Sequence, residues 1–162
     1  MIIHRKTEIE RLALSFRKAI EYAHDDGRFT QRPFDNFPKD CCDDTSILLG
    51  QYIIDHGFGC KIARGEYFED YYEESQRYSI SYYHEWLKVD NYYVDITADQ
   101  FINDKYFSGV KNLLSSCYVG TGNAFFRSFE SIKYTSFYGI DDFPYETIAR
   151  LNNLFKSICS YL

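Results

Sequence analysis

Two runs with strand-like composition, separated by one short turn, limit the folds that this chain can adopt. The runs are RYSISYYHEWLKV at 77–89 and NYYVDIT at 91–97, both rich in β-branched and aromatic residues, with Asp90-Asn91 as the turn between them. A third run of the same character, CKIARGEY, begins at Cys60. Because strands joined by a short turn run antiparallel, the middle of the chain predicts an antiparallel sheet.

Segments with helical periodicity lie on both sides of these strands. From Glu8 to His24, apolar side chains recur three and four positions apart, and Thr7 and Glu10 suit a capping box at the start of a helix. A second helix is predicted to end near Asp55, and a third to cover residues 144–161.

The remaining segments are less regular. The stretch 25–40 contains two prolines and predicts a loop, and the acidic, aromatic run FEDYYEES at 68–75 predicts an exposed connection. Residues 105–137 predict strands and loops. The order helix, helix, strands, helix is typical of an α+β fold with helices packed on an antiparallel sheet, and 162 residues fit a single domain, 1–162.

Charge and composition exclude several functions. The formal net charge is −6 and no stripe of Lys and Arg is present, so we expect no binding to nucleic acid. The N-terminal segment has no apolar run long enough for a signal peptide or a membrane span, which predicts no membrane association and a cytoplasmic location. Export by a specialised route, as an effector or toxin, stays open. The five cysteines form no obvious disulfide framework, so we expect reduced thiols.

Two adjacent cysteines stand where the second helix begins, in the run FPKDCCDDTSILLG. Unpaired backbone N–H groups and the helix dipole at that end stabilise a thiolate, whereas the two aspartates that follow oppose it. A cationic partner is therefore needed, and His84, inside the strongest strand pattern, is the candidate. Cys41 and Cys42 lie on neighbouring sides of the helix, so periodicity leaves both open, although the small Ser46 leaves room beside Cys42.

The turn between the two strands decides whether this histidine can meet a carboxylate. A two- or four-residue loop pairs His84 with Thr97 and places Asp95 diagonally from the imidazole, on the same face of the sheet. An odd loop would shift the register and put Asp95 on the opposite face. With the even register, Asp95 orients His84, which takes the thiol proton so that the thiolate attacks an acyl carbon. Asp99 is a rival for the orienting role.

The run FPKDCCDDTSILLGQYIIDHG, followed by HEWLKVDNYYVDITADQF, resembles the core of the papain-like and transglutaminase-like cysteine acyl-transfer superfamily. The resemblance covers roughly residues 31–101. It implies a core in which the nucleophile opens a helix, with Cys42 as nucleophile, His84 as base and Asp95 as orienting carboxylate. It therefore favours Cys42 over Cys41.

The resemblance also implies supporting groups. An oxyanion-hole amide is expected six residues before the nucleophile, where this chain has Asn36, and a tryptophan is expected to wall the site, here Trp86. No cofactor is implied. The metal-binding patterns C-x-x-C and H-E-x-x-H are missing from the sequence, so we expect no metal.

These features together predict a thiol-dependent acyl-transfer enzyme that works through a thioester on Cys42. It would be a peptidase, amidase or deamidase, with transglutaminase as a further option, and its substrate a peptide or protein. The alternative is a catalytically inactive member of the same fold that serves as a protein-binding or regulatory module. Acetyl transfer from coenzyme A is a third reading, disfavoured because such enzymes normally need a longer chain. The sequence leaves the oligomeric state open.

Overall fold

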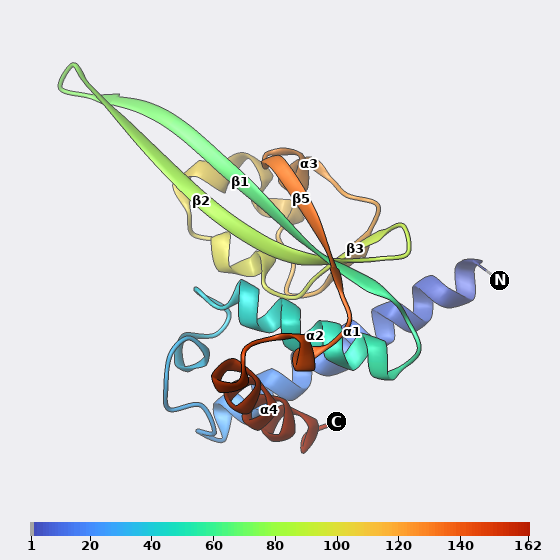
Figure 1. Ribbon diagram of the computed structural model, residues 1–162. Helices are drawn as coiled ribbons and strands as arrows, with labels where there is room; N and C mark the ends of the chain where they lie inside the picture. Colours follow the sequence, from blue (N-terminus) through green and yellow to red (C-terminus); the bar gives the residue numbers. More distant parts are fainter. Residues whose placement is uncertain (1) are drawn as a thin grey trace.

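A five-stranded antiparallel sheet organises the chain (Figure 1). The structure, a computed structural model, describes residues 2–162. The α+β class with an antiparallel sheet, predicted from the sequence, is confirmed. The strands lie in the order β4-β3-β2-β1-β5. They are β1 (Cys60–Glu73), β2 (Gln76–Val89), β3 (Tyr92–Asp95), β4 (Tyr118–Gly120) and β5 (Glu130–Phe137).

Helices cover both faces of this sheet. Helices α1, α2 and α4 lie on one side, and α3 lies with short 3-10 helices on the other (Figure 1). Within residues 2–162, no helix combines the length and apolar character needed to cross a membrane. The α-helices are α1 (Ile2–Asp25), α2 (Cys42–Asp55), α3 (Ala124–Arg127) and α4 (Tyr145–Cys159). The 3-10 helices are Phe34–Asn36, Ala98–Phe101, Lys105–Leu113 and Ile140–Asp142.

The first helix starts earlier than its periodicity predicts. Helix α1 begins at Ile2, so Thr7 lies inside it and the predicted capping box is wrong. No glycine or proline precedes Thr7, and Arg5 pairs with Asp90 in the β2–β3 turn at 2.9 Å, which tethers the additional turns to the sheet. The predicted end of the second helix at Asp55 is confirmed.

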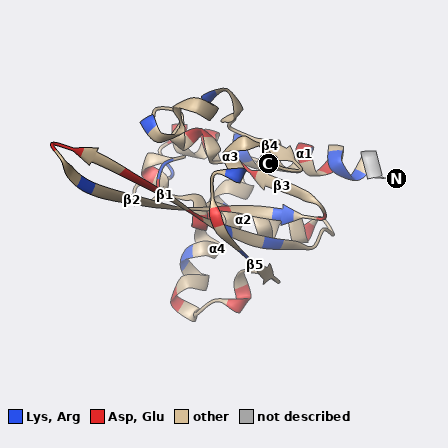
Figure 2. Cartoon of the chain, turned by 90° about the horizontal axis from the view of Figure 1, so that it is seen from above, with Lys and Arg blue, Asp and Glu red and all other residues tan. Residues whose placement is uncertain are grey.

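Strands β1 and β2 form a hairpin that is longer than the sequence predicts and extends past the helices (Figure 1). The segment 68–75 was expected to be a connection, but residues 68–73 continue β1, and only Glu74-Ser75 makes the turn to β2, with φ angles of 49° and 67°. Tyr71 stacks on Tyr78 across the strands with ring centroids 5.3 Å apart, and such cross-strand pairs stabilise an exposed hairpin. Acidic residues lie at its tip (Figure 2).

The two faces of the sheet bury different side chains. Toward α1, α2 and α4, β2 presents Leu87 and Val89, which belong to a largely aliphatic core. The opposite face presents Trp86, which packs with buried phenylalanines, among them Phe125 from α3. Because side chains alternate along a strand, His84 shares the aromatic face with Trp86.

The segment 105–137 differs in part from its prediction. It contains β4 and β5, as a mixture of strands and loops requires, but also α3 and a 3-10 helix of 9 residues. These helices bring Phe107 and Phe125 onto the aromatic face. Helix α3 is too short to show a periodic signal in the sequence, and a 3-10 helix repeats every three residues and so lacks the α-helical period.

Candidate active site

The β2–β3 turn sets the register on which the site depends. Asp90 adopts a φ of 52°, and Leu87 pairs with Val94, as a two-residue turn requires. Asp95 therefore lies on the face of His84, and Oδ2 of the carboxylate is 2.7 Å from Nε2 of the imidazole. The predicted register and the predicted contact between these two side chains are both confirmed.

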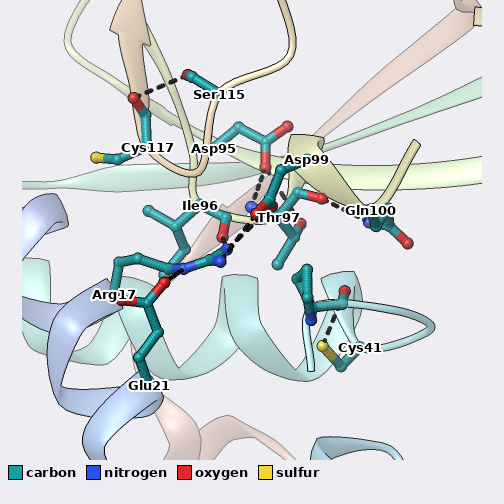
Figure 3. A network of polar contacts seen from close by, with 11 residues as sticks. Arg17, Glu21, Cys41, Asp95, Ile96, Thr97, Asp99, Gln100, Ser115 and Cys117 are labelled. Atoms are coloured by element: carbon teal, nitrogen blue, oxygen red, sulfur yellow. Dashed lines mark hydrogen bonds and ion pairs between the residues drawn. The ribbon is translucent and has the colours of Figure 1, made fainter. Parts of the chain in front are cut away.

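The carboxylate of Asp95 is held at its other oxygen by Thr97 (Figure 3). Oδ1 accepts hydrogen bonds from the backbone N–H of Thr97 at 2.8 Å and from its hydroxyl at 3.2 Å. Asp95 is buried. Its orientation is therefore fixed by the backbone that follows β3, which leaves Oδ2 directed at the imidazole.

Arg17 of α1 secures the segment that follows Asp95 (Figure 3). It donates to the carbonyl oxygen of Ile96 at 2.6 Å and, through both terminal nitrogens, to the carboxylate of Asp99 at 3.0 and 2.9 Å. Arg17 is itself buried, so this pairing is well shielded from water. Asp99, the rival for the orienting role, is committed to Arg17, and Asp95 is the one that bonds to His84.

The imidazole of His84 is enclosed by aromatic rings. The residue is fully buried, and its ring centroid lies between 5.1 and 5.8 Å from four neighbouring rings. Gly65, which pairs with His84 in the β1–β2 ladder, makes this packing possible, because a Cβ there would lie 2.7 Å from the Cβ of Phe129. The four rings are those of Trp86, Phe101, Phe125 and Phe129.

The pKa of His84 results from opposing effects. Burial by itself lowers it, but the charge and hydrogen bond of Asp95, together with the neighbouring Cys42, raise the pKa to about 10. The ion pair with Asp95 therefore favours the protonated form of the ring. Asp95 holds Nε2, so Nδ1 is the nitrogen left for the sulfur of Cys42. Nδ1 has no hydrogen-bond partner of normal geometry within the described residues, although Cys42 is near enough to raise the pKa of the ring.

The two adjacent cysteines have different surroundings. Cys41 is fully buried, its Sγ donates to the carbonyl oxygen of Pro38 at 3.2 Å, and burial raises the pKa of its thiol to about 12 (Figure 3). Cys42 is partly exposed and lines a cavity of about 360 Å³. It is also the cysteine that acts on His84. Of the two thiols, Cys42 is the one that a substrate can reach.

The start of α2 supplies backbone donors beside this thiol. Cys41 is the N-cap residue without a side-chain capping bond, and Cys42 is the first residue of the helix. N–H groups in the first turn have no partner inside a helix, so those of Cys42 and Asp43 can bind an anion. Asp44 accepts two hydrogen bonds from Arg150 of α4, which counters its negative charge near the thiol.

Charged side chains surround the cavity at Cys42. Carboxylates outnumber cations by four to two, and Arg64 bonds to Glu85 at 3.2 Å. Burial and the nearby charge of Asp43 raise the pKa of Glu85. The cavity therefore favours a cationic ligand over an anionic one. These charged residues are Lys39, Asp40, Asp43, Arg64, Glu85 and Asp104.

The prediction that Asn36 supplies an oxyanion donor is not supported, because the structure does not bring it to the cavity. Asn36 ends a 3-10 helix in which Phe34 is the buried residue, and it faces solvent outside the lining of the cavity. The carboxamide that does line the cavity is Gln100, whose Nε2 donates to the carbonyl oxygen of Thr97 at 3.0 Å. Sequence reasoning missed Gln100, although its place in ADQF, five residues after the orienting Asp95, was a usable signal.

Trp86 lies behind the imidazole and does not line the cavity. It is fully buried, its ring centroid is 5.6 Å from that of His84, and its Nε1 has no hydrogen-bond partner in the described part of the chain. The expected role as a wall of the site is therefore corrected: Trp86 supports the buried side of the imidazole ring.

Comparison with known proteins gives no match: no protein-family model, curated protein or solved structure matches the chain. Among residues 2–162, no three His, Cys, Asp or Glu side chains gather as a metal-binding group. The fold is α+β, and the site consists of the bonded pair His84 and Asp95 next to a cavity lined by Cys42. Its function has to follow from the chemistry of these side chains.

Proposed function

We propose that the protein is a thiol-dependent acyl-transfer enzyme in which Cys42, His84 and Asp95 form a catalytic triad. The observation that supports this is a buried imidazole oriented through Nε2 by Asp95, with its other nitrogen left for the accessible thiol at the start of α2. The order of Cys-led helix, His strand and Asp strand also leads us to propose kinship with the papain-like and transglutaminase-like superfamily.

The first half-reaction transfers an acyl group to sulfur. The thiolate of Cys42, paired with the imidazolium of His84, attacks the carbonyl carbon of an amide or ester, and the carbonyl electron pair moves to oxygen. When this intermediate collapses, the bond to the leaving nitrogen or oxygen breaks, and the leaving group takes the proton from Nδ1 of His84. A thioester on Cys42 and a neutral imidazole remain.

The second half-reaction releases the acyl group. Water is the acceptor we propose, because Cys42 is open to solvent. His84 takes a proton from the water as its oxygen attacks the thioester carbon, and cleavage of the C–S bond restores the thiolate and the imidazolium. An amine in place of water would make the same site a transamidase.

The negative oxygen formed in both halves needs hydrogen-bond donors. We assign this role to the backbone N–H groups of Cys42 and Asp43 at the start of α2, and to the carboxamide of Gln100, which lines the same cavity. One such donor contributes on the order of a hundredfold to the rate of acyl transfer.

The exposed aromatic residues of the hairpin favour a second candidate function, a protein-binding module without catalysis. Phe68 and Tyr72 are 55% and 73% exposed, and aromatic side chains are enriched in protein interfaces. In that case Cys42 would behave as an ordinary thiol, and His84 would not influence it.

Thiol labelling separates the two candidates. Wild type, Cys41→Ala, Cys42→Ala and His84→Gln are treated with iodoacetamide between about pH 5 and 9 and analysed by intact mass and peptide mapping. We expect one label on Cys42 well below pH 8, retained in Cys41→Ala and lost in His84→Gln, because the imidazolium stabilises the thiolate. Alkylation that shows no acid-side reactivity and does not respond to His84→Gln would favour the module and exclude the triad.

A further inference from the structure

The outer part of β2 has an unpaired edge. Strand β2 pairs with β1 along its whole length, whereas β3 pairs with it only over Leu87–Val89. No other strand within residues 2–162 pairs with β2. Residues 76–86 therefore present a free edge where β2 extends past β3 (Figure 1).

The hairpin turn determines which backbone groups face this edge. Because Glu74-Ser75 is a two-residue turn, the flanking pair of Glu73 and Gln76 exchanges both of its backbone hydrogen bonds, and so does every second pair after it. Residues in the alternate pairs direct their N–H and C=O groups away from β1. Leu87 belongs to that series and pairs with Val94 of β3, as the alternation requires. The members of the series on the free edge are Arg77, Ser79, Ser81, Tyr83 and Glu85.

The usual protection of a sheet edge is missing here. Exposed edges are commonly blocked by proline, lysine, a bulge or a covering segment. Ser79, Ser81 and Tyr83 are exposed, and the β1–β2 register is regular throughout. Within the described part of the chain, no backbone or side-chain group bonds to the main chain of these three residues on that side. The edge is therefore available to another strand.

This edge leads to the cavity at the thiol. Tyr83 and Glu85, the last residues of the outward-facing series, line the cavity together with Cys42. A chain that hydrogen-bonds along the edge would run toward Cys42, with successive side chains on alternate faces of β2. Strand addition of this kind obtains affinity from main-chain hydrogen bonds and selectivity from pockets for single side chains.

The charges in the cavity indicate which side chain fits it. Glu85 is paired with Arg64, whereas Asp43, next to the thiol, forms no ion pair within residues 2–162. An ammonium or guanidinium group would therefore find a carboxylate without an ion-pair partner there, and an acidic side chain would be repelled.

We propose that the acyl donor is an extended peptide that adds as a strand to the free edge of β2 over Ser79–Glu85 and places a lysine or arginine side chain beside Asp43. This inference rests on the proposed function, because strand pairing would bring the peptide carbonyl to Cys42. The peptide's main chain is recognised by the edge and its cationic side chain by the cavity.

Binding is tested with full-length Cys42→Ala, which can hold a peptide without reacting. The probes are three pools of acetylated octapeptide amides, randomised except for a central residue fixed as Lys, Glu or Ala. We expect roughly tenfold stronger retention of the Lys pool than of the Glu pool, because opposite and like charges act on the central residue. Hydrogen exchange at the amides of Ser79, Ser81 and Tyr83 should slow with retained peptide. Equal retention, no retention, or protection elsewhere would overturn the proposal.

A matched pair of proline variants tests the edge itself. Ser81 and Phe68 face each other in the β1–β2 register, and both direct an N–H away from the hairpin, but only Ser81 lies on the edge that leads to Cys42. Ser81→Pro removes one donor from the proposed interface and should weaken peptide binding roughly tenfold, whereas Phe68→Pro should change it less than about twofold. Equal losses in both would trace the effect to a weakened hairpin and contradict strand addition.

The peptide proposal and the catalytic proposal can fail separately. If Cys42 labels in a His84-dependent manner while the peptide tests fail, the triad stands and the strand-addition proposal falls. If peptides bind the edge but Cys42 titrates as an ordinary thiol, the edge is not a site for an acyl donor. A concentration-dependent dimer in which Ser81 is protected without peptide would identify a second copy as the occupant and also overturn the proposal.

Discussion

The base and the tip of the β1–β2 hairpin are made from the same two strands in one register, yet their surroundings are opposite. At the base, His84 and Trp86 are fully buried, next to the segment where β2 pairs with β3 over Leu87–Val89 and where β1 pairs with β5. At the tip, Tyr72 is 73% exposed and neither strand pairs with a further strand within the described residues. What differs is the packing around the strands and not the strands themselves.

This difference suits two separate requirements of the proposed site. An imidazole transfers protons efficiently to one chosen group when its orientation is fixed, and the buried base of the hairpin fixes it through Asp95 and the surrounding rings. A peptide can be bound along a strand only when that strand has a free edge, and the outer part of β2 has one. Cys42 lies between the buried base of the hairpin and the free edge of β2, in the cavity that Tyr83 and Glu85 also line.

The largest effect on stability is expected from removing an aromatic ring at the base of the hairpin. Phe125 is fully buried and its centroid lies 5.8 Å from that of His84. Phe125→Ala should lower the free energy of unfolding by about 4 kcal/mol, because it removes buried surface and leaves a cavity. Urea denaturation measures this, with Phe68→Ala on the exposed part of the hairpin as the control, expected to change by less than about 0.5 kcal/mol. Similar values for both variants would contradict the contrast between base and tip.

A smaller effect, visible through pH, is expected from Asp95→Asn. The amide keeps the shape of the side chain but removes the charge that, against burial, raises the pKa of His84 to about 10. The pKa of His84 in the variant should then fall toward or below its ordinary value of 6.5, because burial prevails. NMR titration of the His84 ring measures the shift.

The same change has a consequence for stability. In the wild type the folded-state pKa of His84 lies above the unfolded value, so its contribution to stability is complete below pH 6.5 and is lost as the pH rises through about 10. Denaturation across this range should show a decline in the wild type that is weaker in Asp95→Asn. His56→Gln, at an exposed histidine, should retain the wild-type slope. An identical slope in Asp95→Asn would show that Asp95 does not control the proton on His84.

The parts of the site that sequence reasoning could reach are those set by local periodicity. The alternation along the two strands predicted that His84 meets Asp95 if the loop at Asp90-Asn91 has two or four residues, and the structure shows the two-residue turn that sets this register. Cys41 and Cys42 could not be separated by periodicity, since adjacent helical residues differ only in which tertiary neighbour they meet. Burial of the first and exposure of the second depend on the cavity, which no local pattern encodes.

Loops and short helices account for most of what was missed. The path of the chain between α1 and α2 keeps Asn36 in solvent, while Gln100 reaches the cavity from a short 3-10 helix. The extension of β1 over residues 68–73 was hidden by its acidic composition, although Tyr71 stacks on Tyr78 across the hairpin. Composition indicated exposure correctly there, but it could not distinguish an exposed strand from a loop.

The smallest effect is expected at the tip itself. Tyr72 is among the most exposed aromatic residues of the described chain, so Tyr72→Ser should change the free energy of unfolding by less than about 0.5 kcal/mol and leave the rate of Cys42 alkylation unchanged. Urea denaturation and labelling kinetics of the same preparation measure both quantities. A loss of more than about 1 kcal/mol would show that the tip contributes to packing, which its exposure argues against. Slower labelling without loss of stability would instead show that the tip influences the thiol of Cys42. The inner and outer parts of the hairpin would then no longer have separate roles, the first in orienting His84 and the second in offering a free edge.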